Sequence, residues 1–297
     1  MFKLLPGPLR GLLSLGLYAL NTIFWVIPIF AVAPLKIVLP FPSWRRWCNH
    51  VMNNMAVNWI GVNNFNQRLF GNTQLDVRGT QTLKHRGWYL VIANHQSWVD
   101  ILVLQRIFHR KIPFLKFFIK KQLFWVPLLG QAWWALDFPF MKRYSKEFVA
   151  RHPHLKGKDI EITRRACEKF KTLPVSIMNF VEGTRFTPAK HRHQHSPYDN
   201  LLKTKAGGIA FVLAAMGDHL DSILDVTIVY PSGTNSFWSF ACGNIDEIKV
   251  RIKELPVSQA PVGDYVQDPE FRLAFQAWIN DLWREKDISI GDLLARS

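Results

Sequence analysis

The stretch YLVIANHQSWVD, residues 89–100, decides the expected fold because an unbroken apolar run changes there into a polar loop. The apolar run from Trp88 to Ala93 predicts a buried strand, and the residues from Trp98 to Phe108 predict a helix after it. The polar residues 94–97 lie between the two. Reactive groups in α/β sheets are placed on loops of this kind, directly after a buried strand.

The same alternation of strand-like and helix-like segments continues outward from this stretch. Strands are expected at 74–77, 138–141, 175–180 and 225–230, and helices at 160–172, 207–217 and 269–285. The polar stretch 187–200 has no periodicity and is expected to be a loop. Alternating strands and helices predict an α/β layered domain over residues 71–297, preceded by an amphipathic helical connector at 42–70.

Residues 1–41 are expected to attach the chain to a membrane. From Gly11 to Pro40 the only charged residue is Lys36, and the run 11–33 is long enough to cross a hydrocarbon core of about 30 Å. A turn near Pro28 would fold the segment into a hairpin within one leaflet and keep the flanking basic residues on one face. A single span with a proline kink is the alternative. The flanking basic residues are Lys3, Arg10, Arg45 and Arg46.

Composition limits the class of partner without choosing one. The 297 residues carry a formal net charge of +15, and 13% of them are aromatic, so an anionic partner is expected: nucleic acid, an acidic bilayer or a phosphorylated substrate. A membrane-tethered nucleic-acid-binding protein would explain the charge but not the scarcity of charge through 11–40. The three cysteines have no metal or disulfide spacing and are expected to be buried thiols.

His95 and Asp100 are the first candidate catalytic residues. An imidazole ordinarily titrates near neutrality, which suits proton transfer. If His95 precedes the helix and Asp100 lies in its first turn, the carboxylate can orient the ring, as in acyl-transfer triads. From this segment alone, a helix-capping Asp100 beside an ordinary loop histidine is the favoured interpretation.

A second segment, FVEGTR at 180–185, changes that balance. Gly183 permits an unusual turn, Thr184 offers a hydroxyl and a backbone N–H, and Arg185 offers a planar fork for phosphate. Together, NHxSxxD (94–100) and FVEGTR resemble the motifs of the glycerolipid acyltransferase family, whose best-known members convert lysophosphatidic acid to phosphatidic acid. FPFMKR (138–143), the stretch from Lys120 to Gly130, LKTKAGG (202–208) and VTIVYP (226–231) resemble further family blocks, in the expected order.

This resemblance implies a fold and a set of roles. The fold would be an αβα sandwich around a mixed sheet, with an N-terminal membrane-attached helical element. His95 would be the general base and Asp100 its partner. The acceptor would be lysophosphatidic acid, with glycerol 3-phosphate or another lysolipid as the alternative. The residues that would bind substrate are Lys120, Arg143, Glu182, Gly183, Thr184, Arg185 and Pro231. Glu182 would position Arg185 or a glycerol hydroxyl.

The resemblance also carries expectations about partners and location. The family needs no metal or cofactor, and acyl-CoA or acyl carrier protein would be the co-substrate. The protein would lie at the bacterial inner membrane or an equivalent, with its active site facing the cytoplasm, and no nucleic acid would be bound. Two departures bear on the acceptor: Lys142 stands where an acidic residue is common, and the histidines of the 187–200 stretch are a local addition.

Overall fold

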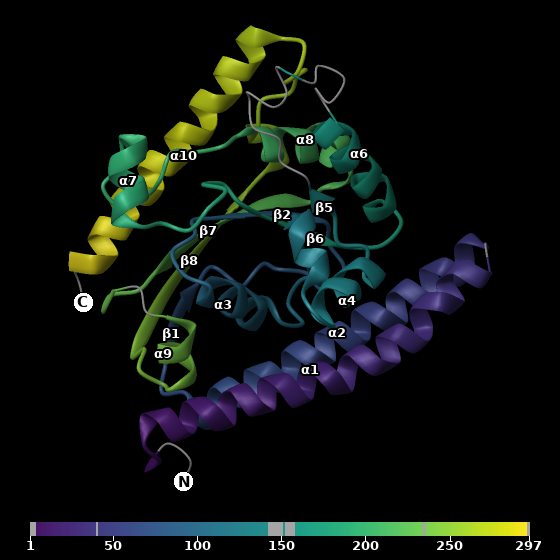
Figure 1. Cartoon of the computed structure of the whole chain (residues 1–297). Coiled ribbons are helices and arrows are strands. Elements are labelled where there is room, and N and C mark those ends of the chain that lie inside the picture. The colour runs from purple at the N-terminus through teal and green to yellow at the C-terminus, as the bar shows by residue number, and fades with distance from the viewer. Residues whose placement is uncertain (1–3, 40, 142–150, 152–157, 234–235, 296–297) are drawn as a thin grey trace.

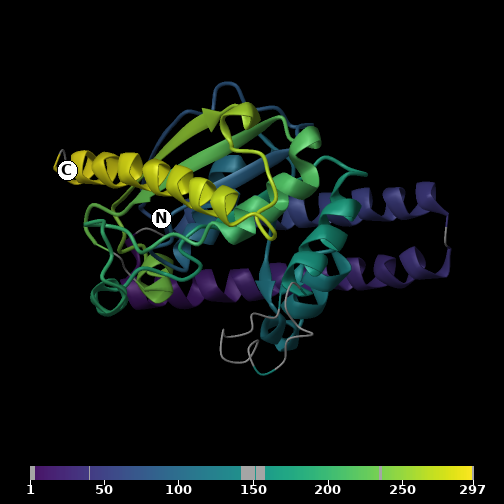
Figure 2. The same cartoon turned by 90° about the horizontal axis from the view of Figure 1, so that it is seen from above.

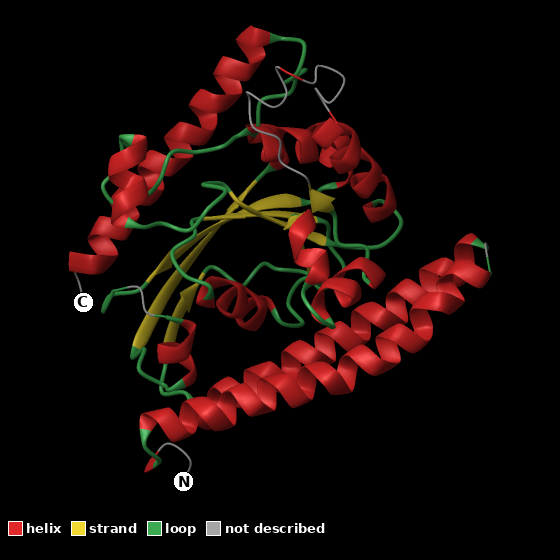
Figure 3. Cartoon of the chain, in the orientation of Figure 1, coloured by secondary structure: helices red, strands yellow, loops and turns green. Residues whose placement is uncertain are grey.

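The computed structural model describes residues 4–39, 41–141, 151, 158–233 and 236–295. A sheet lies between two layers of helices, and a long pair of helices crosses one side of this sandwich (Figures 1 and 3). The chain therefore has the predicted αβα architecture with an N-terminal helical element.

The central sheet has six strands in the order β1-β8-β7-β2-β6-β3. Every neighbouring pair is parallel except β7 and β8, so the sheet is mixed, as predicted. The strands are β1 (Gln74–Arg78), β2 (Tyr89–Ala93), β3 (Leu115–Phe117), β6 (Ser176–Phe180), β7 (Ser222–Val229) and β8 (Glu247–Leu255). A separate parallel pair joins β4 (Ile119–Lys120) to β5 (Phe140–Met141).

Each face of the sheet has its own apolar core, because both faces of the central strands are buried. In β2, Leu90 and Ile92 face the core beneath α6 (Lys158–Phe170), α8 (Gly207–Met216) and α10 (Pro269–Ala295). Val91 faces the opposite core, beneath α3 (Val99–Phe108) and α9 (Phe237–Ala241). A buried ion pair between Lys286 of α10 and Asp225 of β7, 2.6 Å apart, ties the first helical layer to the sheet.

Several elements differ from the expectation. The strand β8 was not predicted, although residues 247–255 alternate apolar and charged side chains as a half-buried strand does. The stretch 187–200 is not all loop, because α7 (Pro188–Gln194) forms within it. This short helix starts where Thr187 accepts a hydrogen bond from the backbone N–H of Lys190, with proline in the first helical position. The last helix continues ten residues beyond the expected 285, to Ala295.

The predicted turn near Pro28 is wrong. Helix α1 (Gly7–Val38) runs unbroken through Pro28 and Pro34, and α2 (Pro42–Phe70) packs back along it, so the turn lies near Leu39 (Figure 2). A proline removes one helical hydrogen bond, but a helix held along its length by a neighbour can accommodate that loss. The N-terminal element is therefore a hairpin of two long helices, α1 and α2.

The α1–α2 hairpin buries polar as well as apolar side chains and exposes a row of further apolar ones. Asn21 donates to the side chain of Asn63 at 2.8 Å and to the carbonyl of Trp59 at 2.9 Å, and Asn66 donates to the carbonyl of Ser14 at 3.0 Å. A row of apolar side chains on α1 is exposed: Leu9, Leu12, Leu13, Leu20, Ile23, Phe24 and Ile27. By length and composition, α1 is the one helix among the described residues that could cross a membrane.

Candidate active site

Two loops meet at the carboxyl ends of the adjacent parallel strands β2 and β6. Ala93 and Phe180, the last residues of the two strands, are paired in register. The loop after β2 carries His95, and the backbone N–H of Phe186, from the loop after β6, donates to the carbonyl of His95 at 2.7 Å. The two motifs that the sequence analysis treated separately are therefore in direct contact.

His95 and Asp100 form a buried pair. The imidazole Nδ1 lies 2.8 Å from Asp100 Oδ2, and the ring stacks on Phe180 with centroids 3.8 Å apart and planes 12° from parallel. The His95 side chain retains 11% of its exposure, whereas that of Asp100 has none. With Nδ1 bound to the carboxylate and the ring plane fixed by Phe180, Nε2 is the nitrogen that can accept a proton from a substrate.

The carboxylate of Asp100 also binds backbone N–H groups at the start of α3. Asp100 Oδ2 also accepts the backbone N–H groups of Gln96 at 2.7 Å and Ser97 at 2.9 Å. The Ser97 contact resembles the return arm of a capping box, because Asp100, the second residue of α3, reaches back to a backbone N–H before the helix. The capping and catalytic interpretations of Asp100 are therefore compatible, because one carboxylate makes both sets of contacts.

Glu182 was expected to bind substrate, but its contacts are structural. The side chain is fully buried, with Oε1 accepting the backbone N–H of His95 and Oε2 that of Leu202, each at 3.0 Å. Burial raises the pKa of Glu182 to about 7, although the two backbone donors oppose that effect. The carboxyl group thus holds the loop after β2 onto the segment before α8, rather than Arg185 or a glycerol hydroxyl.

The remaining residues of the FVEGTR segment line one side of the site. Gly183 has φ of +66°, a conformation in which a side chain is disfavoured. Lys190 Nζ donates to Thr184 Oγ1 and to the carbonyl of Arg185, both at 2.9 Å. The Arg185 guanidinium lies over the ring of Trp98 at 4.5 Å from its centroid, so a cation is held beside the loop that carries His95.

The other predicted substrate-binding residues are placed less closely. Lys120 ends β4 and is exposed, in register with Met141 of β5. Arg143 lies outside the described residues. Pro231 follows β7, which is the neighbour of β2 on the side away from β6, and is partly buried.

The alternating histidines at 191–195 lie on and just after α7. His191 Nε2 lies 2.6 Å from the carbonyl of Tyr198, and His195 ends the helix in a left-handed conformation with φ of +47°. Within the described ranges, no group of three or more His, Cys, Asp or Glu side chains could hold a metal ion. His191 and His195 take part in the local fold of this segment.

Sequence reasoning missed two residues that hold the site together. Asn94 makes a reciprocal pair with the backbone of Ile228, each bond 2.8 Å long, which fixes the end of β2 against β7. Tyr230 Oη lies 2.5 Å from Asp100 Oδ1. The signal for Tyr230 was its position in the VTIVYP block, at the end of a strand adjacent to β2.

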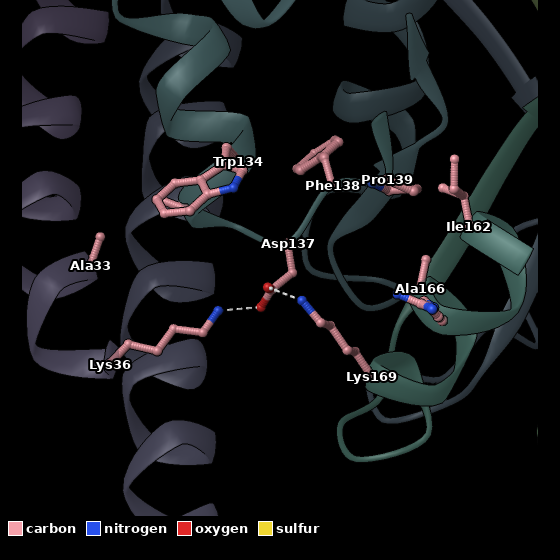
Figure 4. Close-up of a pocket in the computed structure, with 11 residues that line it drawn as sticks. Ala33, Lys36, Trp134, Asp137, Phe138, Pro139, Ile162, Ala166 and Lys169 are labelled. Atoms are coloured by element: carbon pink, nitrogen blue, oxygen red, sulfur yellow. Dashed lines mark hydrogen bonds and ion pairs between the residues drawn. The ribbon is translucent and has the colours of Figure 1, made fainter. Parts of the chain in front are cut away.

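A separate pocket of about 510 Å³ lies between α1, the α4 (Leu129–Ala135) segment and α6 (Figure 4). Asp137 lies at its centre and pairs with Lys36 of α1 and with Lys169 of α6. Burial would raise the pKa of Asp137, but the surrounding lysines outweigh it and hold that pKa below its usual value. Because the pocket contains neither His95 nor Asp100, this ion-pair cluster is a junction between hairpin and sandwich rather than the reaction site.

Several known proteins are similar to this chain in sequence. The family described as Acyltransferase matches residues 74–231, which include both loops of the site. The 1-acyl-sn-glycerol-3-phosphate acyltransferase gamma of Homo sapiens is 24% identical over 213 residues, covering 67% of this chain and 51% of that protein. The chain thus spans about half the length of that relative.

A second relative covers more of the chain. Lysocardiolipin acyltransferase 1 of Danio rerio is 23% identical over 294 residues, covering 94% of this chain and 70% of that protein. Among solved structures, the 1-acyl-sn-glycerophosphate (LPA) acyltransferase PlsC from Thermotoga maritima aligns with a TM-score of 0.47 and 16% identity, covering 92% of this chain and 97% of that one.

Proposed function

Because the chain belongs to the acyltransferase family, we propose that it transfers a fatty acyl chain from a thioester to the free hydroxyl of a lysophospholipid, with lysophosphatidic acid as the acceptor. The observation that carries the proposal is the buried His95–Asp100 pair at the joined ends of β2 and β6. The family match and the relatives that act on acylglycerol phosphates support the reaction class.

The proposed reaction is a single acyl transfer. His95 Nε2 takes the proton of the acceptor hydroxyl as its oxygen attacks the thioester carbonyl. Asp100 stabilises the imidazolium that forms, through the 2.8 Å contact to Nδ1. The tetrahedral intermediate then collapses, the new ester forms, and the thiol of coenzyme A or acyl carrier protein leaves with the proton from His95. No metal or other cofactor enters this scheme.

The acceptor phosphate would lie on the cationic side of the site. Arg185 supplies a planar fork beside the His95 loop, and Trp98 beneath it limits its orientations. Lys190 supports the same segment through Thr184 and the carbonyl of Arg185. Arg143 and Lys120 would add further phosphate contacts by resemblance to the family.

The α1–α2 hairpin would hold the enzyme on the bilayer that contains its acceptor. The exposed apolar row on α1 suits hydrocarbon, whereas α2 is rich in asparagine and carries Arg45 and Arg46 near its start. Because α2 packs along α1, a spanning α1 would carry these polar groups into the hydrocarbon. We therefore propose that the hairpin lies along one leaflet on the cytoplasmic face, with the exposed apolar side chains of α1 turned toward the hydrocarbon.

One assay tests the reaction and the acceptor together. Purified protein in detergent is given radiolabelled acyl-CoA or acyl carrier protein and a panel of lysophosphatidic acid, glycerol 3-phosphate and monolysocardiolipin. Labelled phosphatidic acid from the first acceptor is the expected product. Preferential acylation of monolysocardiolipin would replace lysophosphatidic acid, as the proposed acceptor, by the lysocardiolipin in the name of the Danio rerio relative. Acylation of none of the three would contradict it.

Depth measurements test the membrane arrangement. Spin labels on single cysteines at positions 12, 24 and 35, in a background without the three native cysteines, report depth in vesicles. Similar depths at all three positions are expected for a hairpin lying in one leaflet. A steady change in depth from position 12 to position 35 would establish a span instead.

A further inference from the structure

Tyr230 occupies a position in the site that the proposed reaction does not yet use. It follows β7, the strand beside β2, and its side chain is buried. Its hydroxyl reaches Asp100 Oδ1 at 2.5 Å, across 130 residues of sequence. The contact therefore joins the acid of the His95–Asp100 pair to a different strand of the sheet.

The two oxygens of Asp100 have different partners. Oδ2 accepts from His95 Nδ1 and from the backbone N–H groups of Gln96 and Ser97. Oδ1 contacts Tyr230, the partner that the described part of the chain provides for it. Since Asp100 is fully buried, loss of that donor would leave half of a carboxylate desolvated and uncompensated.

Tyr230 is suited to donate a proton in this hydrogen bond rather than to lose it. Burial first, and then the charge of Asp100, raise the pKa of Tyr230 well above its ordinary value. The Ser97 side chain hydrogen-bonds to Tyr230 and accepts the backbone N–H of Val99 at 3.2 Å, which links the phenol to the start of α3. The phenol is thus oriented from two sides.

We propose that Tyr230 is a positioning residue for acyl transfer, which acts through Asp100 to fix the orientation and the basicity of His95. The inference rests on the proposed function. A hydrogen bond to Oδ1 draws negative charge away from Oδ2, so it weakens the stabilisation of the His95 imidazolium and keeps the ring available as a base at lower pH. The same bond prevents rotation of the carboxylate away from Nδ1.

Among the described residues, the charged groups near the pair include the buried Glu182 and Lys286 and the partly buried Arg185 beside Trp98. Glu182 meets the backbone of His95 and lies within electrostatic range of Asp100. Lys286 partly offsets Glu182 and is itself paired with Asp225. These groups stay unchanged when Tyr230 is substituted, so a change in pH dependence reports the lost hydroxyl.

Tyr230→Phe removes only that hydroxyl. We expect kcat/KM to fall roughly tenfold, as for one lost hydrogen bond to a charged group. The acidic limb of the pH profile of kcat/KM should move up by about 0.5 to 1 pH unit. The shape of this profile does not depend on the fraction of folded enzyme, so partial misfolding would not imitate the shift.

Tyr89→Phe is the matched control. Tyr89 belongs to the same core as Tyr230, at the far end of β2, and its hydroxyl accepts one hydrogen bond, from the backbone N–H of Lys84 at 2.9 Å. This variant should keep the wild-type pH profile. In an Asp100→Asn background, Tyr230→Phe should have little further effect on the residual rate, because the proposed pathway is already interrupted.

Three results would overturn the inference. An unshifted acidic limb in Tyr230→Phe, alongside an inactive His95→Ala enzyme, would reject the positioning role while leaving the proposed function intact. Full additivity with Asp100→Asn would show that Tyr230 acts elsewhere. Normal activity in His95→Ala would overturn the proposed function and this inference with it.

Discussion

The hairpin and the sandwich differ in where their apolar side chains lie. In the sandwich, the central strand β2 has every residue buried against apolar neighbours. In the α1–α2 hairpin, the amides of Asn21, Asn63 and Asn66 lie inside, while Leu20, Phe24 and Ile27 are about two-thirds exposed, at 66%, 65% and 65%. Apolar side chains are therefore exposed on the outer face of α1, whereas those of β2 are buried.

The two parts are joined by charged side chains as well as by apolar packing. A polar junction, Lys36–Asp137–Lys169, lies where the hairpin meets the sandwich. Apolar side chains of both parts pack together at this contact, and the paired charges add a constraint on its position. The hairpin is thus attached to the sandwich through both kinds of contact.

The largest expected effect separates chemistry from membrane attachment. His95→Ala should lower turnover by about 10²- to 10⁴-fold, the usual range for loss of a general base, while leaving binding to vesicles unchanged. Asp100→Asn should also be severely impaired, because an amide cannot stabilise the imidazolium as a carboxylate does. Turnover and vesicle flotation on the same preparations would measure both. Near-normal turnover in folded His95→Ala enzyme would refute the mechanism.

A pair of isoleucines tests the contrast in burial directly. Ile177→Ala, in the sandwich core, should reduce the free energy of unfolding in detergent by about 2–5 kcal/mol because it leaves a cavity. Ile27→Ala, on the outer face of α1, should change that free energy by less than about 0.5 kcal/mol. It should instead weaken vesicle binding, since about three buried carbon groups are lost at ~0.8 kcal/mol each. Equal destabilisation by both changes would show that the outer face of α1 is packed as tightly as the sandwich core, and would contradict its exposure.

Much of this contrast could be predicted from the sequence. The charge-free run, the strand ends and the two motif loops are local patterns, so they predicted an apolar anchor, a mixed α/β sandwich and the His95–Asp100 pair. The predicted turn at Pro28 was wrong because the prediction considered the proline alone. It did not include the long helix α2, which packs along α1 and supports it. The roles of Glu182 and Tyr230 depend on contacts across 20 or 130 residues, which no local pattern reveals.

The pH dependence of stability tests whether burial raises the pKa of Glu182. Because its pKa is raised to about 7 in the folded state, its contribution to stability is complete below the ordinary carboxyl value and is lost as pH rises through 7. The wild-type free energy of unfolding should therefore fall by up to about 3 kcal/mol relative to Glu182→Gln between pH 4.5 and 7.5. Chemical unfolding at several pH values would measure the difference. Parallel pH dependence in the two proteins would show that burial does not shift this group.

The smallest expected effect concerns the acceptor. Arg185→Ala should raise KM for the lysolipid by about 10- to 100-fold, as for a lost charge-assisted contact, with a much smaller change for the acyl donor. Arg185→Lys should recover only part of this loss, because it lacks the planar fork that stacks on Trp98. Arg143→Ala is expected to behave in the same way. If both alanine variants weaken only donor use, the phosphate is assigned to the wrong side of the site.

The register of the sheet sets an order of events during synthesis. In the described part of the sheet, the edge strand β1 pairs with β8, about 170 residues later, and the end of β2 is fixed by Ile228 and Tyr230. Contacts so distant in sequence cannot form while the chain is short, and proteins dominated by them fold slowly. The α1–α2 hairpin, by contrast, is complete after 70 residues. A nascent chain would thus present its apolar face to the bilayer while most of the sandwich is still untranslated, so the enzyme would mature already at the membrane.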